Sequence, residues 1–71
     1  MTREEAIAYT ISTGNPIRHK FFEKDEYVRF DGAEKCLIDE SGIMLPYDEF
    51  WSIRSGGYWE DGWSGYIITK Q

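Results

Sequence analysis

The chain has 71 residues, of which 17% are aromatic, and a formal net charge of −5. This length accommodates one domain, 1–71, with too little buried surface for a large core. The acidic balance disfavours a general DNA- or RNA-binding protein, which needs a basic surface to offset phosphate charge. Nowhere do 18 apolar residues follow one another, so we expect neither membrane insertion nor secretion.

Disulfide, zinc and cofactor support for the fold are not expected. Cys36 is the only cysteine, which excludes a disulfide within the chain and favours a reducing cytoplasm. His19 is the only histidine, whereas a structural zinc needs a cluster of Cys and His ligands. A small core without such support favours self-association, so we expect a homo-oligomer.

The N-terminal segment has the pattern of a short amphipathic helix over 3–13. Thr2 and Glu5 have the spacing of a capping box. Ile7 and Ile11 are four residues apart and form a narrow apolar stripe. A glycine and then a proline follow and end the helix.

Three strands are expected next. The stretches 17–22 and 26–30 have β-branched, aromatic and alternating character, and the polar turn "EKD" between them predicts a hairpin. A third strand, 34–39, follows the "DGA" turn. A three-residue loop places Val28 opposite Cys36 and leaves Leu37 on the outer face, whereas a two-residue loop pairs Val28 with Lys35. We prefer the longer loop, because it avoids an apolar side chain facing a charge.

The second half predicts a short strand, a short helix and a final strand. The strand 43–45 ends at Pro46, which cannot donate to a sheet. The stretch 47–55 carries acids in its first turn and is followed by "GG", as in a short helix. The tail 64–70 alternates and is β-branched. The predicted fold class is α+β: an N-terminal helix, an antiparallel β-meander, and a short second helix before a final strand.

Enzyme signatures are absent from the sequence, which has no glycine-rich phosphate loop, nucleophile elbow or metalloprotease motif. His19 and Cys36 form the one conceivable base and nucleophile pair, but a hydrogen-bonded histidine and a small buried thiol explain them better. The acid pairs 60–61 and 48–49 are best read as solvated or helix-capping. We therefore expect a protein that is not an enzyme.

A basic strand face is the first candidate binding surface. The alternation allows Arg18, Lys20, Arg29, Lys35 and Tyr27 to project on one side of the sheet, as a locally basic patch in an acidic protein. Such a face is suited to phosphates and to stacking on a base, although a solvated sheet surface balanced by Glu26 and Glu34 is the preferred interpretation. The predicted ligand-binding residues are Arg18, Lys20, Tyr27, Arg29 and Trp59.

The stretch "YWEDGWSGY", 58–66, is the second candidate. With Trp51 it brings three tryptophans within 13 positions, more than a marginal core shelters easily. We expect Trp63 to pack against the sheet and Trp59 to be exposed. Arg54 should stack on an indole or pair with the acids at 60–61. Trp51, Arg54 and Trp59 are the predicted interface residues.

Several short motifs together resemble a family of small bacteriophage proteins. They are "EEAI" on the first helix, "GNPIRHKFF" entering the first strand, "EYV", the "DESG" turn and the closing "EDGW". This layout resembles the Thoeris anti-defence sponge family of the second type. The matching positions are Gly14, Arg18 or His19, Phe22, Glu60, Asp61 and Trp63. The chain differs in having Phe22 where the family usually has tryptophan, and its segment "PYDEFWSIR" matches no ligand segment of the family, so no family ligand residue is carried over to this chain.

The resemblance implies an α+β fold, oligomeric assembly and capture of cyclic nucleotide immune signals, so that a host effector is not triggered. The first hypothesis is accordingly a non-enzymatic, phage-type binding protein in the host bacterial cytoplasm that sequesters a nucleotide-derived signalling molecule. The alternative is an acidic phage-type inhibitor that binds a host protein directly through an aromatic and acidic surface.

Overall fold

The computed structural model describes residues 1–67. Helix α1 (Arg3–Thr13) begins and ends as the local sequence predicts. The main-chain N–H of Glu5 donates to Thr2 Oγ1 over 3.1 Å, and the main-chain N–H of Thr2 donates to Glu5 Oε1 over 2.8 Å. These two bonds complete the capping box and satisfy donors that a helix start leaves free. Gly14 ends the helix at φ 74°, a left-handed conformation that suits glycine.

The buried stripe of α1 differs from the predicted one. Ala6 and Thr10, which lie beside the predicted stripe, are fully buried, and Ile7 is partly buried against the core, whereas Ile11 is 45% exposed, so the prediction was wrong for Ile11. The Thr10 hydroxyl donates to the Asn15 carbonyl and accepts from the main-chain N–H of Phe30. A small polar residue therefore joins the helix to the sheet at their contact.

The sheet has five antiparallel strands in the order β4-β3-β2-β1-β5. Their bounds are β1 (Ile17–His19), β2 (Val28–Asp31), β3 (Cys36–Asp39), β4 (Met44–Leu45) and β5 (Trp63–Gly65). The expected meander is confirmed, and the final strand extends it by pairing with β1, with His19 opposite Trp63. The predicted tail strand 64–70 lies partly outside the described residues.

The β2–β3 hairpin has a register that neither predicted loop gives. Val28 lies opposite Asp39 and Phe30 opposite Leu37, so four residues, 32–35, form the turn. Lys35 adopts φ 53° in this turn. Leu37 consequently faces the core and is fully buried, which corrects its predicted outer position. Cys36 lies opposite Asp31 and is only half-buried, so its expected role as a buried hydrophobe was wrong.

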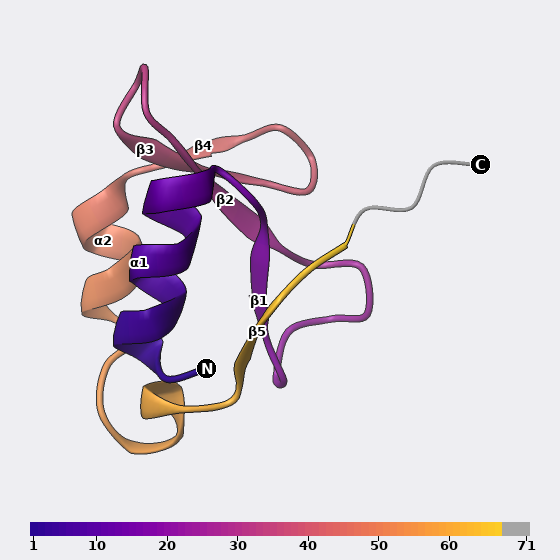
Figure 1. Cartoon of the computed structure of the whole chain (residues 1–71), viewed down its shortest axis with the longest axis vertical. Coiled ribbons are helices and arrows are strands. Elements are labelled where there is room, and N and C mark those ends of the chain that lie inside the picture. The colour runs from indigo at the N-terminus through magenta and orange to yellow at the C-terminus, as the bar shows by residue number, and fades with distance from the viewer. Residues whose placement is uncertain (68–71) are drawn as a thin grey trace.

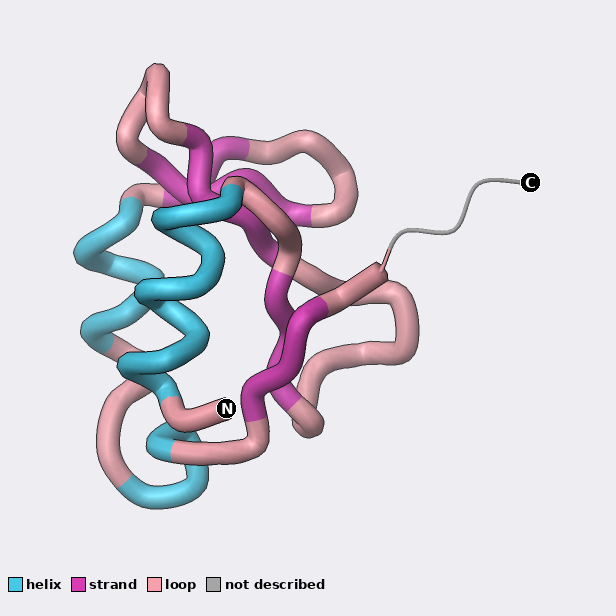
Figure 2. Tube along the Cα trace, viewed as in Figure 1, coloured by secondary structure: helices cyan, strands magenta, loops and turns pink. Residues whose placement is uncertain are grey.

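Two helical segments precede β5. Helix α2 (Tyr47–Ser52) and the 3₁₀ helix η1 (Gly57–Glu60) occupy the stretch between β4 and β5. Figures 1 and 2 show α1 and α2 side by side on one face of the sheet. Arg3 joins them, because its guanidinium donates to the carbonyls of Trp51 and Arg54 at the end of α2.

The core lies between these helices and the sheet. Its fully enclosed members come from both layers: Ala6, Ile17, Val28, Leu37, Phe50, Trp51 and Trp63. The 3₁₀ helix and the start of α1 lie at one end of this core, and the β2–β3 turn lies at the other (Figure 1). The η1 segment and the β2–β3 turn thus form surfaces at opposite ends of the core.

Candidate functional site: a histidine-anchored aromatic patch

His19 is the centre of an aromatic cluster at the η1 end of the molecule. The side chain is fully buried. Its Nδ1 accepts from the main-chain N–H of Phe21 over 3.1 Å, and its Nε2 lies 3.0 Å from the Tyr58 carbonyl and 2.7 Å from the Asp61 carbonyl. Because a carbonyl only accepts and an N–H only donates, the ring carries its proton on Nε2. The expected hydrogen-bonded histidine is confirmed.

Two exposed aromatic side chains are held by this one imidazole. Phe21 is 60% exposed and Tyr58 is 62% exposed. Their rings meet edge to face, with centroids 5.0 Å apart and planes at 80°. We call this pair the aromatic patch. The backbone of each residue of the pair is hydrogen-bonded to a nitrogen of the buried His19 ring, so the two exposed rings form a preformed surface.

The backbone between Asp61 and β5 must approach His19 closely. Gly62 has φ 91°, and a Cβ at this position would lie 3.1 Å from His19 Nε2. Glycine is therefore required both for the backbone conformation and for the close approach. The same Cβ would contact the Lys20 side chain. The Lys20 ammonium lies 5.5 Å from the centre of the Phe21 ring and adds a cation to the edge of the aromatic patch.

The tryptophans are placed differently from the prediction in two cases of three. Trp63 is 2% exposed and packs against the sheet, as expected, and its Nε1–H donates to the Trp59 carbonyl over 2.7 Å. Trp59 is half-buried and packs against the core, so the exposed aromatic of this segment is Tyr58. Trp51 is only 4% exposed, because the chain's own core encloses it. Its ring is not available for the predicted interface.

Arg54 stacks on aromatic rings, one of the two roles expected for it. Its guanidinium carbon lies 4.1 Å from the Phe50 ring centre and 5.6 Å from that of Trp59. One guanidinium nitrogen donates to the Phe50 carbonyl, and burial lowers the pKa of the side chain. Arg54 thus connects α2 to η1 within the chain.

The basic face predicted for the sheet is only partly assembled. Arg18, Tyr27 and Arg29 lie on the outer face, since each alternates with a core-facing neighbour. Each has a partner there: Arg18 donates to loop carbonyls at 22–24, Tyr27 stacks on Tyr66, and Arg29 pairs with Asp31. Lys35 lies elsewhere, lining a hollow together with Ile11 and Tyr47. The ligand-binding role of the outer-face residues stays a prediction.

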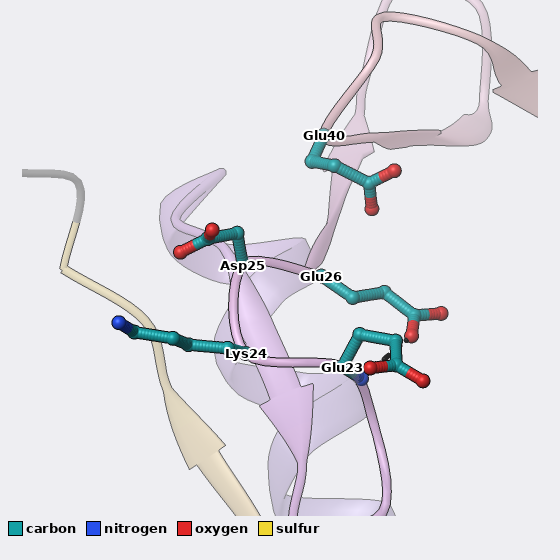
Figure 3. Close-up of a pocket in the computed structure, with 5 residues that line it drawn as sticks. All are labelled: Glu23, Lys24, Asp25, Glu26 and Glu40. Atoms are coloured by element: carbon teal, nitrogen blue, oxygen red, sulfur yellow. Dashed lines mark hydrogen bonds between the residues drawn. The ribbon is translucent and has the colours of Figure 1, made fainter.

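A hollow of about 370 Å³ beside the β1–β2 loop is strongly acidic. Figure 3 shows the carboxyl groups of Glu23 and Glu26 close together, with Glu40 above them, while Lys24 and Asp25 point the other way. Glu26 accepts from the main-chain N–H of Glu23, so it also orders the loop. This concentration of negative charge opposes binding of a phosphate-bearing molecule.

His19 and Cys36 are not brought together as a base and nucleophile. His19 faces the core from β1, whereas Cys36 lies on the outer face of β3. Partial burial, followed by the charges of Asp31 and Glu34, raises the pKa of the Cys36 thiol. Both effects disfavour the thiolate, which is the nucleophilic form.

Within residues 1–67, no three histidine, cysteine or acidic side chains gather closely enough to hold a metal ion. In the same part of the chain, no helix combines the length and apolar character needed to cross a bilayer. The aromatic patch and its anchoring by His19 were missed by sequence reasoning, although "KFF" and "YWED" supply its rings. Comparisons with protein-family models, curated proteins and solved structures find no match to this chain.

Proposed function

We propose that the protein is a non-enzymatic, phage-type anti-defence protein that captures a nucleotide-derived signalling molecule in the host cytoplasm. The observation that supports this proposal is the aromatic patch with Lys20 at its edge. A nucleobase stacks on exposed aromatic rings whatever its hydrogen-bonding pattern, and an ammonium group attracts the phosphate. Rings fixed before binding lose little conformational freedom when the nucleotide arrives.

Self-association of the chain is part of this proposal. The aromatic patch is open, so one copy covers only one side of a bound base. A second copy placed against it would supply the other side and enclose the phosphate away from water, where its contact with Lys20 strengthens. The resemblance to the sponge family supports an oligomer, and so does the small core.

The test is calorimetric titration with a panel of cyclic mono- and dinucleotides. We expect reversible binding and release of the intact nucleotide on denaturation. Tyr58→Ser removes one ring of the aromatic patch and should weaken binding by about 5- to 150-fold, the range for loss of one base-stacking contact. Ile43→Ser is the matched control, because Ile43 is 58% exposed and lies in the turn before β4. Equal binding by both variants would refute the patch as the site.

A direct interaction with a host protein is the alternative, and one observation favours it. Glu60 and Asp61 are exposed and follow Tyr58 and Trp59 along the chain, so the segment that carries Tyr58 is also acidic. Exposed aromatics with charges at the rim are typical of protein-binding hot spots. Affinity capture from the host, with and without Tyr58→Ser, separates the two: an inhibitor retains one host protein through Tyr58, whereas a sponge retains a nucleotide.

A further inference from the structure

A groove lies at the end of the molecule opposite the aromatic patch. It is bounded by the C-terminal part of α1, the β2–β3 turn and the start of α2, which Figure 1 shows close together. Its volume is about 450 Å³, within the range of small-molecule sites. The residues that line it are Ile11, Phe30, Gly32, Lys35, Tyr47 and Asp48.

The floor of the groove is apolar and aromatic. The rings of Phe30 and Tyr47 meet edge to face, with centroids 5.9 Å apart and planes at 84°. Ile11 adds an aliphatic side chain that is 45% exposed, although it belongs to α1. A Cβ at Gly32 would lie 4.0 Å from the Phe30 ring, at ordinary van der Waals distance, so glycine adds no side chain to this edge of the groove. A flat apolar group has room to pack there.

Two opposite charges border this floor. Lys35 reaches it from the β2–β3 turn and Asp48 from the first turn of α2. Among residues 1–67, neither forms an ion pair with the other or with a third residue. The groove therefore offers one ammonium and one carboxylate to a bound molecule, together with an aromatic floor.

We propose that this groove binds a small aromatic zwitterion, of the kind represented by a free aromatic amino acid. The ring packs on Phe30 and Tyr47, the carboxylate meets Lys35, and the ammonium meets Asp48. A molecule with no net charge fits better than a nucleoside phosphate, whose two negative charges would meet Asp48 with a single lysine to offset them. The net charge of −5 on the chain adds to that difference.

NMR titration of the ¹⁵N-labelled chain with L-tryptophan tests the proposal. We expect shifts confined to amides of the β2–β3 turn and the start of α2, with a dissociation constant in the millimolar range for so open a site. Tryptamine lacks the carboxylate and indole-3-propionate lacks the ammonium, and each should bind about 2- to 5-fold more weakly, as expected for loss of one solvent-exposed ion pair. Equal binding of all three compounds, or no shifts at the groove, overturns the proposal.

Two variants and two matched controls link the shifts to the charges. Lys35→Asn removes the ammonium and introduces a residue that tolerates the φ of 53° at this position. Asp48→Asn removes the negative charge and keeps the shape of the side chain. Each should weaken L-tryptophan binding by about 2- to 5-fold, as expected for loss of one solvent-exposed ion pair. Lys24→Asn and Glu49→Gln change the same charges outside the groove and should leave binding unchanged. Tighter binding of AMP than of L-tryptophan at these amides would show that the groove takes a phosphate instead, which also refutes the zwitterion.

Discussion

Two buried tryptophans differ in whether the indole N–H is bonded, and this difference predicts a difference in stability. Trp63 and Trp51 are 2% and 4% exposed, and their rings are in contact, with centroids 5.0 Å apart. The Trp63 Nε1–H donates to the Trp59 carbonyl over 2.7 Å, whereas the Trp51 Nε1–H is buried without a partner among the described residues. Replacing each tryptophan with phenylalanine removes the same atoms, including the indole N–H, which is hydrogen-bonded in Trp63 and unbonded in Trp51.

The loss of ring volume is the same in both variants, so it largely cancels in their comparison. Trp63→Phe also breaks a hydrogen bond and leaves the Trp59 carbonyl without its donor, at about 1 kcal/mol or more. Trp51→Phe instead removes an unsatisfied N–H, whose burial costs about 1–3 kcal/mol. We therefore expect Trp63→Phe to be less stable than Trp51→Phe by about 2 kcal/mol or more.

Urea denaturation followed by circular dichroism measures this difference. With a slope of about 1 kcal/mol per molar urea for a domain of this size, the two midpoints should differ by about 2 M. Unchanged slopes in both variants show that the comparison concerns the folded state. If Trp51→Phe is as unstable as Trp63→Phe, or less stable, the hydrogen-bond assignment in the core is wrong.

Trp63→Ala should cost about 3–5 kcal/mol against a total of ~4–11 kcal/mol for 71 residues, so its melting temperature should fall by about 12 °C or more; a cooperative melt close to that of the wild type would contradict the core assignment. Burial raises the pKa of Tyr47 in the folded chain above its usual 10.0. The protonated side chain therefore stabilises the fold fully below pH 10, and this contribution to the free energy of unfolding is lost as pH rises through the raised pKa of the folded state. Tyr47→Phe should therefore lose less stability than the wild type in melts above pH 10, and an identical alkaline loss would count against this. Asp31→Asn removes a charge that raises the pKa of the Cys36 thiol, so alkylation by iodoacetamide at pH 8 should become faster; an unchanged or slower rate would exclude that coupling.

The sequence by itself determined the elements that depend on local chemistry. The bounds of α1 were predictable because Thr2, Glu5 and Gly14 fix a helix start and end within a few residues of chain. The antiparallel meander followed from alternating segments separated by short turns, and α2 followed from acids in its first turn after Pro46. The α+β class was therefore available before any contact between distant residues was known.

The hairpin register and the groove depended on tertiary structure. The three-residue loop preferred from the sequence turns Leu37 outward, whereas the observed turn of four residues places Leu37 opposite Phe30 and buries it in the core. That turn places Lys35 at φ 53°, which the sequence gives no reason to expect of a lysine. It also carries Lys35 from the outer face of the sheet to the groove.

The aromatic patch depended on contacts between residues about 40 positions apart. The sequence shows that aromatics gather at 58–66, but it does not show which of them a distant residue buries. His19 accepts from its neighbour Phe21 and donates to the carbonyls at 58 and 61, and this fixes Tyr58 outward while Trp59 packs inward. The sequence set which aromatic rings were available. Which of them remain exposed was decided by the burial of the His19 imidazole against the backbone of η1, because each buried nitrogen of the imidazole needs a hydrogen-bond partner.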